Sequence, residues 1–310
     1  MRYAPYAALL AAAALWGTNP VLGRLVGVAV PPVTLSWLRW LVVLCAVAPF
    51  VWPQRREVAA AARSHWHVLL LLAALANVPQ SALIYKGLQT TSAVNVGLLN
   101  SSIPVLILLI GALFFARPAG RREFAGIALS LLGVAVLLFQ GSVERVLSLS
   151  LNRGDLIAFG GMLTWAWYTL LLPRRPVLPL LAFVFCMSAI GVALGAPAVL
   201  AEVILDRPPR LDGAVLLGIA LIAAGPTLGG TLAYSYGAER VGAVQAGVFV
   251  HFMPVFATLF ATLLLDERAR VYHLAGFALV LAGALLALDS SRLLSSRPAR
   301  PLSTTGRSHG

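Results

Sequence analysis

The chain consists of long apolar blocks that are separated by short clusters of proline, glycine and charged residues. A transmembrane helix needs about 20 apolar residues to cross the hydrocarbon core of a bilayer. Block lengths and breaks predict ten such helices, over residues 4–28, 33–52, 66–85, 91–115, 122–140, 154–173, 177–200, 213–236, 241–265 and 271–290. The connections are too short for a soluble domain. We therefore expect an all-α integral membrane protein with ten transmembrane helices.

Composition agrees with this prediction. Of 310 residues, 60% are apolar and 11% charged, and the mean hydropathy is +0.89, whereas soluble domains are about 45–50% apolar and about 25% charged. This excludes a soluble enzyme, a separate nucleic-acid-binding domain and a disulfide scaffold. Cys45 and Cys186 lie in apolar blocks, where we expect them to pack as small hydrophobic residues. The apolar stretch after Arg2 continues to Val28, which favours an uncleaved first helix over a signal peptide.

The net charge of +12 is explained by topology. Lys and Arg gather on the cytoplasmic side of membrane proteins. With the N-terminus inside, the cytoplasmic segments carry twice as many basic residues as the opposite side. We therefore predict a multi-pass protein of the cytoplasmic (inner) membrane with both termini cytoplasmic and no nucleic-acid partner. Residues 291–310 are rich in Ser, Pro and Arg, so we expect a disordered basic cytoplasmic tail that contacts membrane lipid.

An internal repeat relates the two halves of the chain. A shift of 150 residues aligns glycines and prolines, and a shift of 149 aligns two tryptophans. The aligned pairs are Gly87 and Gly237, Pro104 and Pro254, Gly126 and Gly276, Gly133 and Gly283, and Trp16 and Trp165. We predict a first five-helix repeat over 1–141 and a second over 154–290. Because each repeat has an odd number of spans, the second is inverted, which is typical of secondary transporters with a site near the bilayer midplane.

Polar side chains inside a bilayer are costly without a partner and usually face the bundle interior or a wet cavity. We predict a cavity within spans 1, 3, 4, 6, 8 and 9. Its candidate substrate-binding residues are Trp16, Asn19, Asn77, Gln80, Asn100, Ser101, Trp165, Tyr168, Thr227, Tyr234, Gln245 and His251. Two alternatives remain open: hydrogen bonds between helices for the polar residues, and an interfacial aromatic belt for the two tryptophans.

Prolines and arginines within the spans add further hypotheses. Pro104 and Pro254 are predicted at mid-helix, where proline removes a backbone hydrogen bond and bends the helix. They indicate a hinge or gate, with a static kink as the alternative. Arg24 and Arg39 are predicted near the outer ends of spans 1 and 2, where we expect their side chains to snorkel to the interface. Contact with an anion or carboxylate is the alternative.

Coupling to protons has one candidate. The predicted spans contain no mid-span carboxylate, and His251 is the mid-span residue type that titrates near neutral pH. Protons are therefore a candidate coupling ion, while exchange and facilitated diffusion without protons remain open.

Several motifs resemble one family over nearly the whole chain. The motifs are Leu15-Trp16-Gly17-Thr18-Asn19-Pro20, Leu38-Arg39-Trp40, Gly154-Asp155 followed by Trp165, and Val241-Gly242-Ala243 followed by Pro254-Val255, Asp266-Glu267 and Gly276. They resemble EamA-type members of the drug/metabolite transporter superfamily. The resemblance implies ten helices, cytoplasmic termini and export or exchange of small metabolites, often amino acids. One departure is Ala116-Arg117-Pro118, where the family usually has a Gly-Glu-Arg type of turn.

Together these observations predict a secondary transporter that moves a small-molecule substrate by alternating access, with its cavity at the repeat interface. The expected cargo is amino acids or related amphipathic solutes, and the expected direction is export. A facilitated-diffusion channel and a non-transporting membrane receptor are the alternatives. The sequence has no HExxH, no GxSxG and no His/Cys/Asp/Glu cluster at metal-ligand spacing. We therefore expect no enzyme activity, catalytic residue, metal or cofactor, and a monomer or weak homodimer.

Overall fold

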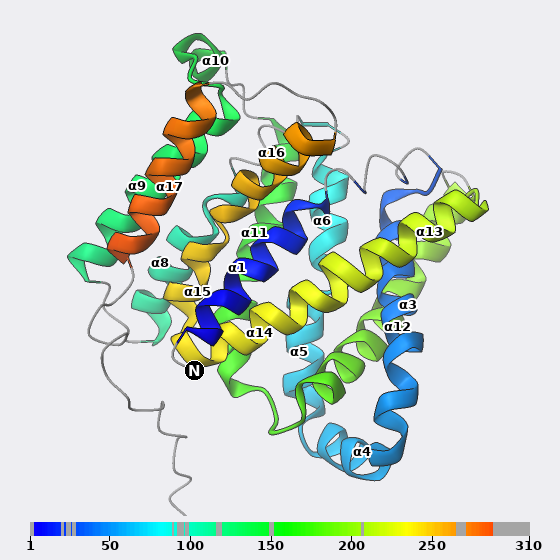
Figure 1. Ribbon diagram of the computed structural model, residues 1–310. Coiled ribbons are helices and arrows are strands. Elements are labelled where there is room, and N and C mark those ends of the chain that lie inside the picture. The colour runs from blue at the N-terminus through cyan, green and yellow to red at the C-terminus, as the bar shows by residue number, and fades with distance from the viewer. Residues whose placement is uncertain are drawn as a thin grey trace, which may run out of the picture.

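A computed structural model describes residues 3–19, 22, 26, 29–88, 90–91, 96, 99–115, 120–148, 152–205, 208–264 and 271–287. Within these residues every regular element is a helix (Figure 1). The first half contains α1 (Ala4–Gly17), α3 (Pro32–Val51), α4 (Arg55–Ser64), α5 (Trp66–Ala76), α6 (Val78–Leu88), α8 (Ile103–Phe115), α9 (Arg121–Leu138) and α10 (Val143–Leu147). The second half contains α11 (Arg153–Leu171), α12 (Leu180–Leu205), α13 (Gly213–Ile222), a π-helical segment (Ala223–Gly229), α14 (Gly230–Val241), α15 (Ala243–Phe249), α16 (Phe252–Leu264) and α17 (Val271–Ala287).

Five helical stretches in the described residues are long and apolar enough to cross a membrane. They are Pro32–Ser64, Trp66–Ile84, Arg153–Arg174, Leu180–Leu205 and Gly213–Val241. Shorter apolar helices accompany them, and large apolar side chains point outward, with Leu113 exposed by 77% and Leu205 by 82%. Water would not tolerate this surface, whereas lipid would. These helices and their apolar surface confirm the all-helical membrane fold that the sequence predicts.

Side-chain caps define where several helices begin. The Asn152 side chain accepts a hydrogen bond from Gly154 N at 2.7 Å at the start of α11, and Asp212 accepts one from Val215 N at 2.8 Å at the start of α13. These bonds satisfy backbone donors that a helix leaves free in its first turn. At its far end α14 stops at Gly242, whose φ of +95° is a conformation that suits glycine.

Three predicted spans are interrupted, and one of them, over 91–115, is broken by a turn at 101–102. The span predicted over 66–85 breaks at Asn77 between α5 and α6, because the Asn77 backbone leaves the helical region. Its buried side chain donates a hydrogen bond from Nδ2 to Met187 O on α12 at 2.6 Å. The span predicted over 241–265 breaks at residues 250–251, between α15 and α16. The cytoplasmic connection predicted between spans 2 and 3 contains a helix of its own, α4.

The expectation that Pro104 and Pro254 lie at mid-helix was wrong. Pro104 is the second residue of α8 and Pro254 the third residue of α16. Proline fits the first turn of a helix because its missing N–H has no partner there. Each proline follows a turn, at 101–102 in one half and at 250–251 in the other. The regular helix is therefore interrupted just before the prolines, not at them.

Helices α9 and α17 pack closely along a row of glycines and lie side by side in Figure 1. A Cβ atom built on Gly126 would lie 2.5 Å from Gly283 O, and one built on Gly133 would lie 2.8 Å from Gly276 O. The lower number in α9 meets the higher number in α17, so the helices are antiparallel. Glycine allows this contact because no side chain separates the two backbones.

Candidate functional site: a cavity between the two halves

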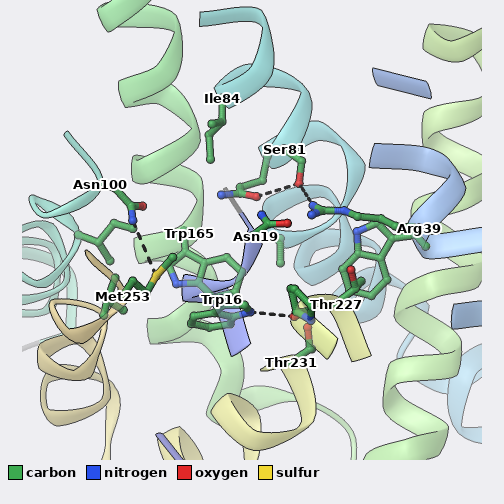
Figure 2. Close-up of a pocket in the computed structure, with 16 residues that line it drawn as sticks. Trp16, Asn19, Arg39, Ser81, Ile84, Asn100, Trp165, Thr227, Thr231 and Met253 are labelled. Carbon is green, nitrogen blue, oxygen red and sulfur yellow. Dashed lines mark hydrogen bonds between the residues drawn. The ribbon is translucent and has the colours of Figure 1, made fainter. Parts of the chain in front are cut away.

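A cavity of about 170 Å³ lies inside the helical bundle and is drawn in Figure 2. A single water needs only about 10–15 Å³ of such volume, so the cavity has room for a small solute. Its lining comes from both halves of the chain: α1, α3, α5, α6 and the start of α8 in the first, and α11, the π-helical segment, α14 and α16 in the second.

An aromatic wall closes one side of the cavity. The rings of Trp16 and Trp165 are perpendicular, with centroids 5.4 Å apart. Tyr234 supports both rings from behind, at 5.0 Å from Trp16 and 5.6 Å from Trp165. The Trp16 indole donates a hydrogen bond from Nε1 to Pro226 O at 2.9 Å. The pair that aligns in the sequence repeat therefore forms one rigid surface, held by edge-to-face contact and by a hydrogen bond.

A polar group occupies another side. Arg39 donates a hydrogen bond from Nη2 to Ser81 Oγ, and the Ser81 hydroxyl donates in turn to Gln80 Oε1 at 3.2 Å. Asn19 also lines the cavity, and Figure 2 shows it beside Ser81 and Arg39. Arg39 borders the cavity and is hydrogen-bonded to Ser81 of α6. Its guanidinium therefore lies inside the bundle, and the snorkelling expected for it was wrong. Arg24 lies outside the described residues.

Half of the predicted site residues line this cavity. They are Trp16, Asn19, Gln80, Asn100, Trp165 and Thr227. Asn77 and Tyr168 instead line a second cavity of about 10 Å³, which shares Trp40, Ala76, Trp165 and Thr231 with the first. That volume suits at most a single water. Asn77 and Gln80 belong to the same predicted span, but the break in the helix turns the Asn77 side chain toward α12.

The other four predicted residues join helices behind the cavity wall. His251 Nε2 lies 2.9 Å from Ser101 O, and the Gln245 side chain accepts a hydrogen bond from the Tyr6 hydroxyl at 3.3 Å. The hydroxyls of Tyr234 and Thr169 are 3.1 Å apart. All four predicted residues are buried, and none borders either cavity among the described lining. For Ser101, Tyr234, Gln245 and His251 the structure shows the alternative that the sequence left open, hydrogen bonding or packing between helices.

The second span contributes more than the sequence indicated. The second span was not among the spans predicted to form the cavity. Arg39 and Trp40, which both belong to it, nevertheless border the cavity. Thr231 and Met253 were also missed, and Met253 Sδ lies 3.8 Å from the Asn100 amide nitrogen. The available signal was the arginine itself, since a charge inside an apolar block usually faces a cavity.

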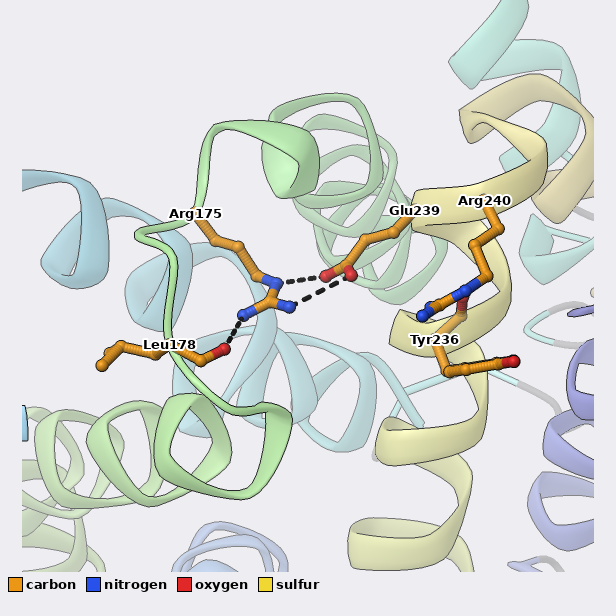
Figure 3. Close-up of polar contacts among 5 residues, drawn as sticks. All are labelled: Arg175, Leu178, Tyr236, Glu239 and Arg240. Atoms are coloured by element: carbon orange, nitrogen blue, oxygen red, sulfur yellow. Dashed lines mark hydrogen bonds and ion pairs between the residues drawn. The ribbon is translucent and has the colours of Figure 1, made fainter. Parts of the chain in front are cut away.

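Polar contacts fix helix ends outside the cavity. Arg175 forms an ion pair with Glu239 of α14 and donates from Nη1 to Leu178 O at 2.8 Å (Figure 3). The Glu202 carboxylate on α12 accepts hydrogen bonds from Val33 N at 3.0 Å and from Thr34 N at 2.7 Å. A carboxylate is favourable at the N-terminus of α3 because the free N–H groups and the helix dipole point toward it.

Fold and cavity define a polytopic helical membrane protein with a solute-sized site between its halves. The family model of the EamA-like transporter family matches residues 4–139 and 152–288. The chain belongs to this family, which confirms the resemblance seen in the motifs and makes the protein a membrane transporter with a two-repeat architecture.

Relatives and a solved structure agree with this assignment. The uncharacterized transporter YyaM of Bacillus subtilis (strain 168) is 28% identical over 218 residues, which are 69% of this chain and 70% of the relative. The uncharacterized transporter YetK of the same organism is 24% identical over 298 residues, 95% of this chain and 89% of the relative. A crystal structure of a protein that is 22% identical has a TM-score of 0.77, with 96% of this chain and 100% of the other covered.

Proposed function

We propose that this protein is a secondary carrier that exports small polar or amphipathic solutes, amino acids foremost, across the cytoplasmic membrane. Family membership supports transport, and the cavity between the halves is the observation that carries the proposal. Its wall combines Trp16 and Trp165, which are equivalent in the repeat, with hydroxyl and amide groups from other helices. Such a lining suits a solute with one polar end and one apolar end.

Contacts between equivalent residues support two inverted five-helix repeats. Residues 150 apart in the chain are equivalent, and a residue can contact its own equivalent only near a symmetry axis. His251 contacts Ser101 O, and the Ser130 hydroxyl donates to Val280 O at 3.2 Å. Each pair is separated by 150 residues.

The glycine row supports the orientation of that axis. Under the same shift the contact of Gly126 with Gly283 becomes the contact of Gly276 with Gly133, which also exists. This reciprocity is the mark of a two-fold relation. Because α9 and α17 are antiparallel, the axis is perpendicular to them and lies in the membrane plane if they cross the bilayer. That arrangement favours ten spans, cytoplasmic termini and a site near the midplane.

Alternating access needs points at which the spans can bend. The turns at 101–102 and 250–251 interrupt the fourth and ninth predicted spans. They share the equivalent pair Ser101 and His251, whose contact joins them. Pro104 and Pro254 lie in the first turn of the helices that follow, where proline costs no helical hydrogen bond. We assign the hinge to these two turns, with the prolines fixing where each helix resumes.

Counterflow tests the proposal. Proteoliposomes with the purified full chain are loaded with unlabelled leucine and phenylalanine, and uptake of the labelled amino acids is followed. We expect saturable uptake that Trp165→Ala abolishes and that the matched variant Trp66→Ala preserves, because Trp66 is 61% exposed and far from the lining. Uptake that rises linearly with concentration and ignores the internal load would indicate a channel. No uptake of either amino acid would contradict the proposed cargo.

A pH gradient tests proton coupling in the same vesicles. His251 does not border the described cavity, and its Nε2 is engaged with Ser101 O. Flux that follows the gradient in the wild type and ceases to do so in His251→Gln would assign proton coupling to this residue. Flux that ignores the gradient in both proteins would make the carrier an exchanger or uniporter.

A further inference from the structure

We infer that the cavity takes solutes with a single carboxylate group and that Arg39 binds this carboxylate. The inference rests on the proposed function for the role of the cavity, and it adds the chemical class of the substrate. It replaces the broad expectation of amphipathic solutes with one requirement: a single negative charge at one end of an apolar body.

The first support is an uncompensated charge. Arg39 is the charged residue of the described cavity lining. Within the described part of the chain the ion pair is formed by Arg175 and Glu239, and no carboxylate contacts Arg39. The whole sequence has 11 acidic residues, and the predicted spans contain none of them at mid-span. Because a charge within a membrane domain requires a partner or water, an anionic solute fits this position.

The second support is an excess of hydrogen-bond donors. A guanidinium carries five N–H groups and no acceptor, and Arg39 uses one of its nitrogens to donate to Ser81 Oγ. Its Nε is buried and has no hydrogen-bond partner among the residues that the structure describes. The Asn19 side chain makes no recorded hydrogen bond with another described residue, and Figure 2 shows its amide close to the Arg39 guanidinium. The described residues at this end of the cavity offer the guanidinium neutral hydroxyl and amide acceptors but no carboxylate. A carboxylate would supply two charged oxygens in a geometry that matches the guanidinium.

The third support is the remainder of the lining. Trp16, Trp165 and Met253 form an apolar surface away from Arg39 (Figure 2). The described lining contains no carboxylate that would pair with an ammonium group, so the amino group of an amino acid is not required. One cation matches one negative charge, which favours a carboxylate over a doubly charged phosphate.

Calorimetric titration of the purified full chain in detergent tests the inference without transport. The probes share one body: 3-phenylpropionate, its neutral amide 3-phenylpropionamide, the cation 3-phenylpropylamine and the dianion 2-phenylethyl phosphate. We expect the carboxylate to bind about 30-fold or more tightly than the amide, because loss of one partner of a buried charge pair has effects of this size. The cation should not bind, and the phosphate should bind more weakly than the carboxylate.

Variants assign the effect to a residue. Arg39→Gln should reduce the ratio of carboxylate to amide affinity to near one, and Arg39→Lys should keep part of it because a lysine retains the charge without the planar fork. The matched control is Arg240→Gln, because Arg240 is exposed and stacks on Tyr236 outside the cavity.

Three results would overturn the inference: a wild-type protein that does not bind 3-phenylpropionate, equal binding of acid and amide, or an unchanged ratio in Arg39→Gln. If Arg39→Gln fails to fold, binding of the four probes to the wild-type protein still decides the substrate class. The affinity ratio in Arg39→Lys then decides whether Arg39 is the residue responsible. Tight, Arg39-dependent binding of 3-phenylpropionate without counterflow of the same acid would uphold this inference and contradict the carrier. Counterflow that is equally fast for the acid and for its neutral amide would uphold the carrier and contradict this inference.

Discussion

The contact between α9 and α17 leads to a paired stability prediction. At Gly133 a Cβ atom would lie 2.7 Å from Val280 N and 2.8 Å from Gly276 O. Both neighbours are backbone atoms of α17, so neither can rotate away. Overpacking of this kind costs about 1–3 kcal/mol, while replacing a helical glycine by alanine gains about 0.5–1 kcal/mol. We expect Gly133→Ala to lower the free energy of unfolding by about 1–2 kcal/mol.

The repeat makes the same prediction at a second site. Gly283 is equivalent to Gly133, and a Cβ atom there would lie 2.5 Å from Gly126 O. Gly283→Ala should therefore cost about as much as Gly133→Ala, measured as the midpoint of unfolding in detergent. The control is Gly213→Ala at the exposed start of α13, where a Cβ meets no atom within 4 Å. If either buried variant unfolds at or above the wild-type midpoint, the close antiparallel contact is wrong.

Three further predictions concern contacts outside the glycine row. Glu202→Gln should lower stability by about 1–3 kcal/mol, because the carboxylate accepts charge-assisted hydrogen bonds from the start of α3; the unfolding midpoint reports the loss. Arg175→Gln and Glu239→Gln should show a coupling of about 1 kcal/mol in a double-mutant cycle, since the pair is partly exposed, and high salt should reduce it. Trp16→Phe should cost about 1 kcal/mol, because phenylalanine keeps a ring but loses the hydrogen bond to the π-helical segment.

Each of these predictions has a contradicting result. The matched control for Glu202→Gln is Glu144→Gln, because Glu144 is exposed on α10. If the two variants have the same unfolding midpoint, Glu202 does not cap α3. If the stability losses of Arg175→Gln and Glu239→Gln simply add in the double variant, the ion pair contributes no coupling energy. A Trp16→Phe protein with the wild-type midpoint would show that the indole hydrogen bond is not formed.

Much of the fold follows from apolar length and helix breakers. Helix α3 covers Pro32–Val51 against the predicted 33–52, and α9 covers Arg121–Leu138 against 122–140. Interruptions inside spans were not predictable, because their cause is distant in sequence: the helix breaks at Asn77 where its side chain meets Met187 O, 110 residues away. Local rules also misplaced the prolines, since Pro104 is compatible both with a kink and with a first turn.

The site was predictable where chemistry and repeat agreed. Trp16 and Trp165 are equivalent by sequence and meet at the cavity. Polar type alone could not distinguish a cavity wall from a contact between helices, because both face inward, and so Gln245 and His251 were included although they join helices. Arg39 was assigned to the interface because it was predicted near the outer end of the second span, and its contact with Ser81 of another span could not be seen in the sequence.

The central claim is a cavity that opens alternately to the two sides of the membrane. Its direct test is Thr231→Cys, a cavity position, in a background with Cys45→Ala and Cys186→Ala. A membrane-impermeant maleimide is applied to right-side-out and to inside-out vesicles. We predict labelling from both sides, in separate preparations, while the control Ser64→Cys on exposed α4 is labelled only in inside-out vesicles. Labelling of Thr231→Cys from one side alone would contradict alternating access.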